Sequence, residues 1–196
     1  MDWVVVLVKD FVAAKQRLGP ALDPRSRRAL ARRNAERAIR AAAAGDRRLV
    51  VAGSEEVGRF AKRLGADFIV EPRQEGQNTA AQRGIRHALD AGAEAVLLLS
   101  SDLPFVTKGA IRALLDEARV DSGAVAIAVP AIGRGGTNAL YLRPPGVINL
   151  HFGSDSLASF QRDAESKGVR FLVRPTAEMA LDLDEPVDLV HLRLAV

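Results

Sequence analysis

The sequence predicts an α/β fold in three layers, with helices on both faces of a mostly parallel sheet. Continuous Val/Leu/Ile runs, such as residues 3–9 and 95–99, are typical of strands buried on both faces. Helical segments separate these runs, which is the alternation found in α/β proteins. The chain has 196 residues, of which 48% are hydrophobic and 27% charged, and shows no internal repeat or linker. We therefore expect one domain over residues 1–196 with a full hydrophobic core.

Strands and helices alternate through the first half of the chain. A loop runs from the first strand to Gly19-Pro20, and Asp23-Pro24 then opens a helix, because Asp caps a helix and Pro suits its first turn. Ser54 before two glutamates opens the next helix, and Gly65 closes it. The remaining elements expected here are strands at 48–52, 67–71 and 95–99 and a helix at 78–91.

The second half adds an antiparallel element to this pattern. Thr107 caps a helix that continues to about Arg119. Strands at 124–129 and 138–142 flank a glycine-rich turn, a combination that favours a hairpin. The remaining elements expected here are helices at 156–167 and 186–194 and a strand at 170–173.

Composition excludes several classes of protein. The chain has no cysteine, which rules out disulfides, thiolate metal sites and cysteine nucleophiles. It has no run of 18 apolar residues, so we expect no membrane span, and its first residues suit a strand better than a signal peptide. We therefore expect a cytosolic protein. The net charge of +4 comes largely from arginines of the helix that begins at Pro24, which favours a solvated helix face and disfavours nucleic-acid binding.

Three aspartates are candidate ligands of Mg²⁺. Asp102 follows a buried strand, where open α/β sheets bind ligands. Asp182 and Asp184 lie two residues apart in an extended segment, so their side chains point to the same side. Carboxylate oxygens of this kind suit Mg²⁺, which completes its shell with phosphate oxygens and water. The alternative is that each aspartate only forms a turn or caps a helix.

A basic loop follows the first strand. Lys9, Lys15 and Arg17 lie within nine residues at the predicted crevice, and both residue types bind triphosphates well. The loop lacks the glycine spacing and the Gly-Lys-Ser/Thr ending of a P-loop, which argues against P-loop hydrolysis. A basic loop that is merely solvated remains the alternative.

Three further segments are candidate binding sites for a nucleoside or an anion. Asn78 lies among small and amide residues at a helix start, where a base or ribose can approach, although it could equally cap the helix. Thr137 follows three glycines that can form an anion nest or a plain hairpin turn. Gly153 precedes a helix that Ser156 opens, and backbone N–H groups at such a helix start bind anions. The alternative is that Ser156 is only the N-cap of this helix.

The order and spacing of these motifs resemble one known family over nearly the whole chain. The family is that of the CofC/FbiD-type guanylyltransferases of coenzyme F420 biosynthesis, which are small nucleotidyltransferases with the Rossmann-like fold of nucleotide-diphospho-sugar transferases. The motifs that carry the resemblance are Lys9-Asp10-Phe11 with Lys15 and Arg17, Ser101-Asp102-Leu103-Pro104, Gly135-Gly136-Thr137-Asn138, Phe152-Gly153-Ser154-Asp155-Ser156 and Leu181-Asp182-Leu183-Asp184-Glu185-Pro186.

The resemblance implies an activity and a role for each candidate residue. Such enzymes join GTP to phosphoenolpyruvate or 2-phospho-L-lactate and release pyrophosphate. The substrate phosphate is already an anion, so the reaction needs positioning and charge neutralisation rather than a nucleophilic side chain. By the family pattern, Mg²⁺ is held by Asp102, Asp182 and Asp184, the substrate phosphate by Thr137, Gly153 and Ser156, the GTP triphosphate by Lys15 with Lys9 and Arg17, and the guanosine lies near Asn78. Lys15 and Asp102 are then the catalytic residues.

Other functions remain open at this point. Family members often carry a histidine a few residues after the Ser156 position, where this chain has Phe160, so the acceptor could also be 3-phosphoglycerate. Another nucleotidyltransferase of the same fold is an alternative, but such enzymes typically carry a Leu-Ala-Gly-Gly loop where this chain has Lys9-Asp10-Phe11. A basic nucleic-acid-binding module is the alternative that is not an enzyme. A homodimer is compatible with the sequence but not required by it.

Overall fold

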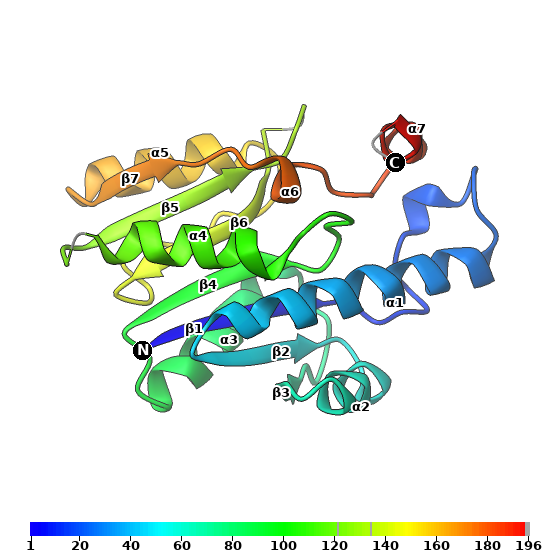
Figure 1. Ribbon diagram of the computed structural model, residues 1–196, viewed down its shortest axis with the longest axis horizontal. Coiled ribbons are helices and arrows are strands. Elements are labelled where there is room, and N and C mark those ends of the chain that lie inside the picture. Colours follow the sequence, from blue (N-terminus) through cyan, green and yellow to red (C-terminus); the bar gives the residue numbers. More distant parts are fainter. Residues whose placement is uncertain (121, 134, 195–196) are drawn as a thin grey trace.

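All strands that the structure describes belong to one mixed sheet. The computed structural model describes residues 1–120, 122–133 and 135–194 (Figure 1). The strands are β1 (Asp2–Val8), β2 (Arg47–Ala52), β3 (Asp67–Val70), β4 (Ala95–Ser100), β5 (Val125–Pro130), β6 (Thr137–Arg143) and β7 (Arg170–Val173). Their order across the sheet is β3-β2-β1-β4-β6-β5-β7.

The sheet is parallel except at β6. β1 pairs in parallel with β2 and β4, β2 with β3, and β5 with β7. β6 runs antiparallel to both β4 and β5, so it forms the predicted hairpin with β5 and then lies between that strand and β4. The predicted mostly parallel sheet with an antiparallel element is therefore confirmed. Because β6 runs opposite to β4 and β5, its first residue lies at the edge of the sheet where β4 and β5 end.

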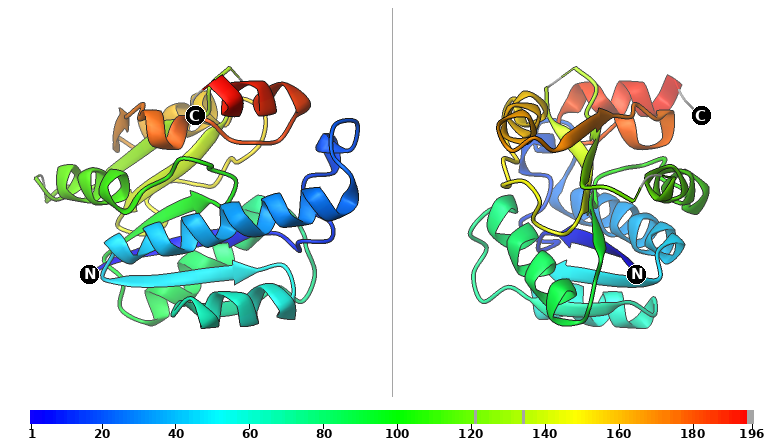
Figure 2. Two further views of the ribbon diagram at one scale, coloured as in Figure 1. Left: turned by 45° about the vertical axis from the view of Figure 1, so that its right-hand side comes forward. Right: turned by 90° about the vertical axis from the view of Figure 1, so that its left-hand side faces the viewer.

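Helices cover both faces of this sheet, as Figure 2 shows in its right-hand view. Buried residues of α1, α2 and α4 pack in one hydrophobic core with one face of the sheet, and those of α3 and α5 pack in a second core on the other face. No helix in the described ranges is long and apolar enough to cross a membrane. The helices are α1 (Pro24–Ala41), α2 (Glu55–Arg63), α3 (Gln77–Asp90), α4 (Lys108–Arg119), α5 (Ser156–Ser166), α6 (Ala177–Ala180) and α7 (Pro186–Leu194), with short 3-10 helices η1 (Gln16–Leu18) and η2 (Ala42–Ala44).

Small residues let two helices, α1 and α3, pack closely against the sheet. Ala31, Ala35 and Ala38 form the apolar stripe of α1 and are buried, while the arginines lie around the rest of the helix. Gly84 brings α3 close to the sheet, because a Cβ atom at this position would lie 2.5 Å from a methyl group of Val5. Small side chains at these contacts let the helices approach the strands closely.

Several helix starts confirm the predicted caps and others do not. The Asp23 carboxylate accepts a hydrogen bond from the Ser26 N–H at 3.0 Å, and the Thr107 hydroxyl accepts one from the Ala110 N–H at 3.1 Å. Gly76, at φ 97°, caps α3, so the alternative in which Asn78 caps this helix is wrong. α6 was not expected, because four residues are too few to show helical periodicity.

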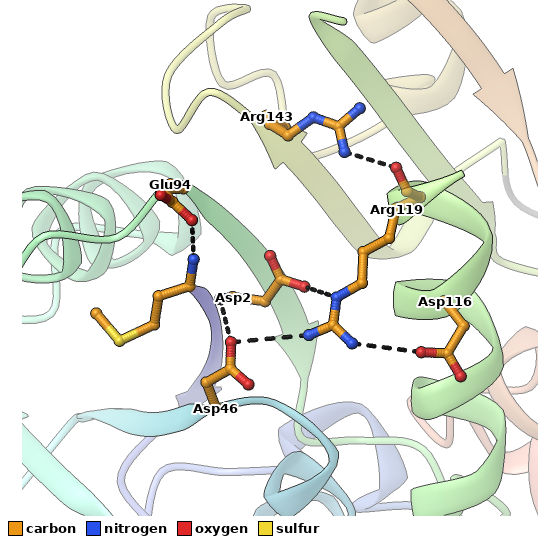
Figure 3. A network of polar contacts seen from close by, with 8 residues as sticks. Asp2, Asp46, Glu94, Asp116, Arg119 and Arg143 are labelled. Atoms are coloured by element: carbon orange, nitrogen blue, oxygen red, sulfur yellow. Dashed lines mark hydrogen bonds and ion pairs between the residues drawn. The ribbon is translucent and has the colours of Figure 1, made fainter. Parts of the chain in front are cut away.

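A network of charges fastens the amino-terminal end of β1, where the strand begins (Figure 3). The Arg119 guanidinium contacts the carboxylate of Asp2 at 2.8 Å, that of Asp46 at 3.7 Å and that of Asp116 at 3.4 Å. Asp2 is buried, and Arg119 comes from the last turn of α4. The network therefore ties α4 to the edge of the sheet opposite the one where the parallel strands end.

Candidate active site

A wide cleft lies at the edge of the sheet where its parallel strands end. Its volume is about 540 Å³, and its walls come from the loop after β1, the end of β4, the start of β6, the loop before α5 and the segment between α6 and α7. Open α/β sheets bind their ligands at this edge. Of the residues expected at the site, the cleft brings together Lys9, Lys15, Arg17, Asp102, Thr137, Gly153, Ser156, Asp182 and Asp184.

Lys15 is a buried cation at the centre of this arrangement. Its Nζ lies 2.8 Å from Oδ1 of Asp102 and also donates a hydrogen bond to the carbonyl of Leu183. The Lys15 side chain is 2% exposed and that of Asp102 34%. The loop that carries Lys15 is anchored by Phe11, whose buried ring packs edge-on against Phe60 with 5.4 Å between the ring centroids. A buried charge needs a partner, and the lysine has one carboxylate and one carbonyl.

The two carboxylates between α6 and α7 face the cleft together. Asp182 and Asp184 both line it, while Leu183 between them is fully buried, which confirms the expected i, i+2 arrangement. The Leu183 N–H donates to the Asp102 carbonyl at 3.2 Å, so this segment lies beside the end of β4. The Asp188 carboxylate accepts hydrogen bonds from two successive N–H groups, those of Asp184 at 2.8 Å and Glu185 at 2.7 Å, and thereby shapes the turn.

The donor set suits a divalent metal ion, although its carboxylates are engaged with cations. Asp102 pairs with Lys15, and Oδ2 of Asp184 lies 2.9 Å from the Arg17 guanidinium. Within the described residues no three metal-ligating side chains are gathered in one group. The three aspartates nevertheless offer hard oxygen ligands on one cleft, which is the chemistry that Mg²⁺ requires. Magnesium at these residues therefore stays a prediction.

The cleft also carries hydroxyl groups. Ser156 Oγ donates to Thr137 Oγ1 at 3.0 Å, and both side chains are buried. Ser156 is the first residue of α5, and the N-cap position belongs to Asp155, so the alternative of Ser156 as a plain cap is wrong. Gly153 has φ 139°, a backbone conformation that side chains disfavour. Hydroxyls and helix N–H groups facing one cleft suit a phosphate.

Asn78 lies outside the wide cleft. Its side-chain amide forms two hydrogen bonds with the backbone of Phe152, donating to the carbonyl at 3.0 Å and accepting from the N–H at 2.8 Å. These bonds connect α3 with the loop that carries Gly153. A contact between Asn78 and guanosine stays a prediction, whereas its neighbour Gln77 does line the cleft.

A second, inner cavity of about 110 Å³ adjoins the wide cleft and escaped the sequence analysis. Lys9, Lys15 and Gln77 line both spaces. Toward α3 the inner cavity is lined by Glu71 and Gln74. A single glutamate after a strand carries no distinctive sequence signal, since only the fold shows that its side chain is enclosed.

Asn138 is a further residue whose role the sequence did not disclose. It lies at the start of β6 and is buried, and its amide donates to the carbonyls of Met179 at 2.9 Å and Ala180 at 3.0 Å. These bonds hold α6, and thus the segment that follows it, against the sheet. The neighbouring Thr137 could be chosen from the motif, but the partners of Asn138 lie about forty residues away in the chain.

Comparison with known proteins places this chain among guanylyltransferases. Residues 2–195 match the family described as guanylyl transferase CofC like. The chain is 41% identical over 194 residues to a phosphoenolpyruvate guanylyltransferase from Rubrobacter xylanophilus, covering 97% of this chain and 92% of the relative. It is 32% identical over 189 residues to a 2-phospho-L-lactate guanylyltransferase from Methanothermobacter thermautotrophicus, covering 94% and 81%.

The fold is also that of solved nucleotidyltransferases. A crystal structure of a candidate nucleotide-diphospho-sugar transferase from Desulfovibrio desulfuricans superposes with a TM-score of 0.78 at 19% identity, covering 97% of this chain and 85% of that one. The predicted fold class is thereby confirmed. Nucleotidyltransferases of this kind use a divalent metal ion. The match over nearly all residues and the close relatives show that this chain belongs to the CofC-like family of guanylyl transferases.

Proposed function

We propose that this enzyme joins GTP to phosphoenolpyruvate or 2-phospho-L-lactate, releases pyrophosphate and supplies coenzyme F420 biosynthesis. The observation that supports this most directly is the wide cleft, which a buried lysine, three aspartates and two buried hydroxyl groups line together. The cations suit a triphosphate, and the hydroxyl groups suit the phosphate of a small acid. The substrates named for the relatives in the CofC-like family point the same way.

The reaction transfers the GMP unit. An oxygen of the acid's phosphate attacks the α-phosphorus of GTP, the bond from that phosphorus to the oxygen bridging to the β-phosphate breaks, and pyrophosphate leaves with that oxygen. The attacking oxygen is already ionised, so the site needs no general base. The work of the protein is to align two anions and to offset their charge, which positioning and fixed cations can do.

Each wall of the cleft has its part in this alignment. Lys15, with Lys9 and Arg17, holds the triphosphate and stabilises the charge that develops on the departing pyrophosphate. Thr137, Ser156 and the backbone near Gly153 hold the acid's phosphate. Asp102, Asp182 and Asp184 would hold Mg²⁺, which would act there as a Lewis acid on phosphate oxygens.

The test is pyrophosphate release from GTP and Mg²⁺ with phosphoenolpyruvate, 2-phospho-L-lactate or 3-phosphoglycerate in turn. We expect release with one of the first two acids and little release when ATP replaces GTP. An Asp102→Asn variant should lose most of the turnover and need more Mg²⁺. Release of pyrophosphate with 3-phosphoglycerate alone would show that this acid is the acceptor. No release with any of the three acids, from folded protein that binds GTP, would refute the proposal. Location in the cytosol, a single domain and a homodimer also stay predictions.

A further inference from the structure

The inner cavity is enclosed on several sides by apolar side chains. Phe11 and Ala14 come from the loop after β1, Ala31 from α1 and Ala80 from α3. The cavity opens toward the wide cleft, since Lys15 and other residues line both. A partly apolar cavity next to a triphosphate site is suited to a flat heterocycle, provided that its polar groups satisfy the edge of the ring.

Glu71 is a carboxylate of this cavity, which Asp102 and Asp184 also line. It follows β3 directly, and its side chain is only 7% exposed. Its Oε1 accepts a hydrogen bond from the Arg83 guanidinium at 3.0 Å, whereas Oε2 accepts none from the residues that the structure describes. Burial raises the pKa of Glu71, and the charge of Arg83 opposes this. This oxygen belongs to a mostly buried side chain and has no donor from the described protein, so a ligand that supplies donors gains hydrogen bonds by meeting it.

We propose that Glu71 selects guanine by accepting hydrogen bonds from N1–H and the 2-amino group of the base. The inference rests on the proposed function, because it assumes that the triphosphate lies over Lys15 and its neighbours. Oε2 accepts one of the two bonds, and Oε1 accepts the other with the lone pair that Arg83 leaves free. Charge-assisted paired bonds of this kind are strong and directional.

The same geometry rejects other bases. Adenine presents an unprotonated N1 and no 2-amino group to this edge, so it would leave the buried carboxylate without donors. Xanthine retains N1–H but carries an oxygen in place of the 2-amino group, and this oxygen would face the carboxylate. A buried polar group left unpaired discriminates strongly against the wrong ligand. The preference for guanine is therefore assigned to one side chain rather than to backbone contacts alone.

A Glu71→Gln variant reverses this chemistry at one position. The glutamine has the same size and can still accept from Arg83, but its amide donates where the carboxylate accepted. It therefore repels the 2-amino group of guanine and donates to the 2-oxygen of xanthine. We expect the affinity for GTP to fall about tenfold and that for XTP to rise by a similar factor, as the exchange of one hydrogen bond to a charged group predicts. The GTP to XTP ratio then falls about a hundredfold.

The matched control is Glu75→Gln. Glu75 also forms an ion pair with Arg83 but is about half exposed and does not line the inner cavity, so its loss perturbs Arg83 without altering the base edge. The affinities are measured by titration calorimetry with GTP, XTP and ATP in Mg²⁺ and without any acid. The inference would be overturned if the ratio of the affinities for GTP and XTP stayed unchanged in Glu71→Gln or changed equally in Glu75→Gln. It would also be overturned if the wild-type protein bound no GTP. If the wild-type protein prefers GTP to XTP and Glu71→Gln loses this preference, the inference is supported. This holds even if no acid yields pyrophosphate, because that result would refute only the proposed function.

Discussion

Lys15 offers the sharpest test of how the cleft acts on the triphosphate. Replacing it with methionine keeps the length of the side chain and removes its charge. The buried Nζ now lies against Asp102 and the Leu183 carbonyl, so its loss removes the cation from the point where the end of β4 meets the segment carrying Asp184. Arg17 provides a comparison, because its side chain is 69% exposed and its contact with Asp184 lies in solvent.

The burial of the two cations sets the size of the expected effects. A preorganised cation in a site with little water stabilises developing charge far more than one in solvent, and loss of one such group costs about 3–4 kcal/mol, or about 10²–10³ in turnover. We expect this loss for Lys15→Met. An exposed ion pair contributes about 0–1 kcal/mol, so Arg17→Gln should reduce turnover less than about tenfold. Asp102 is partly exposed and can be solvated when Lys15 is lost, so the fold should remain stable.

The assay separates binding from chemistry. Pyrophosphate release is measured over a range of GTP and acid concentrations for wild type, Lys15→Met and Arg17→Gln, with thermal unfolding as the control for folding. If Lys15 acts on the departing pyrophosphate, kcat and kcat/KM fall together. Turnover within about threefold of wild type in a folded Lys15→Met protein would refute the assignment. A rise in the KM for GTP alone would reduce Lys15 to a binding residue.

Three further outcomes follow from particular contacts. Thr137→Val should raise the KM for the acid about tenfold and leave that for GTP unchanged, because only the hydroxyl wall loses a donor; initial rates at fixed GTP measure this. Arg119→Met should lower the free energy of unfolding by about 1–3 kcal/mol without loss of activity, because it leaves the buried carboxylate of Asp2 unpaired far from the cleft; denaturant unfolding measures this. Burial raises the pKa of Asp163, but hydrogen bonds from Lys167 and a backbone N–H outweigh it and lower the pKa below its ordinary 3.8. This stabilisation is present above the unfolded pKa and is lost as pH falls through the folded one, so Asp163→Asn should flatten the fall in unfolding free energy below about pH 4.

Most of the fold was predictable because its elements carry strong local signals. The continuous apolar runs became the strands of the sheet, and the Gly-rich turn after residue 130 became the hairpin that introduces the antiparallel β6. The order of the strands was not predictable from local pattern, since it depends on which strands pair across long stretches of chain. α6 also escaped prediction, because its position is held by the distant amide of Asn138 rather than by its own four residues.

The sequence predicted which residues form the candidate site better than it predicted which of them contact one another. Lys15 and Asp102 follow strands whose ends meet at one edge of a parallel sheet, and the family pattern adds Asp184, so these three residues could be expected together. The pairing of Lys15 with Asp102 could not, because it depends on a loop that Phe11 anchors beneath α2. Glu71 was missed for a related reason: whether a glutamate after a strand faces solvent or a cavity is decided by helices far along the chain.

The pairing of charges in the wide cleft predicts that binding of the nucleotide and binding of the metal are linked. Among the described residues that line the cleft, three cations balance three carboxylates, and Asp102 pairs with Lys15 and Asp184 with Arg17. A triphosphate alone would bring several negative charges against these carboxylates. Asp102, Asp182 and Asp184 would hold a divalent metal ion that arrives with the triphosphate, and the metal would offset part of this charge while Lys15 and Arg17 contact the phosphates. Each charged group would then keep a partner of opposite charge, so the metal and GTP should each raise the affinity for the other by the same factor.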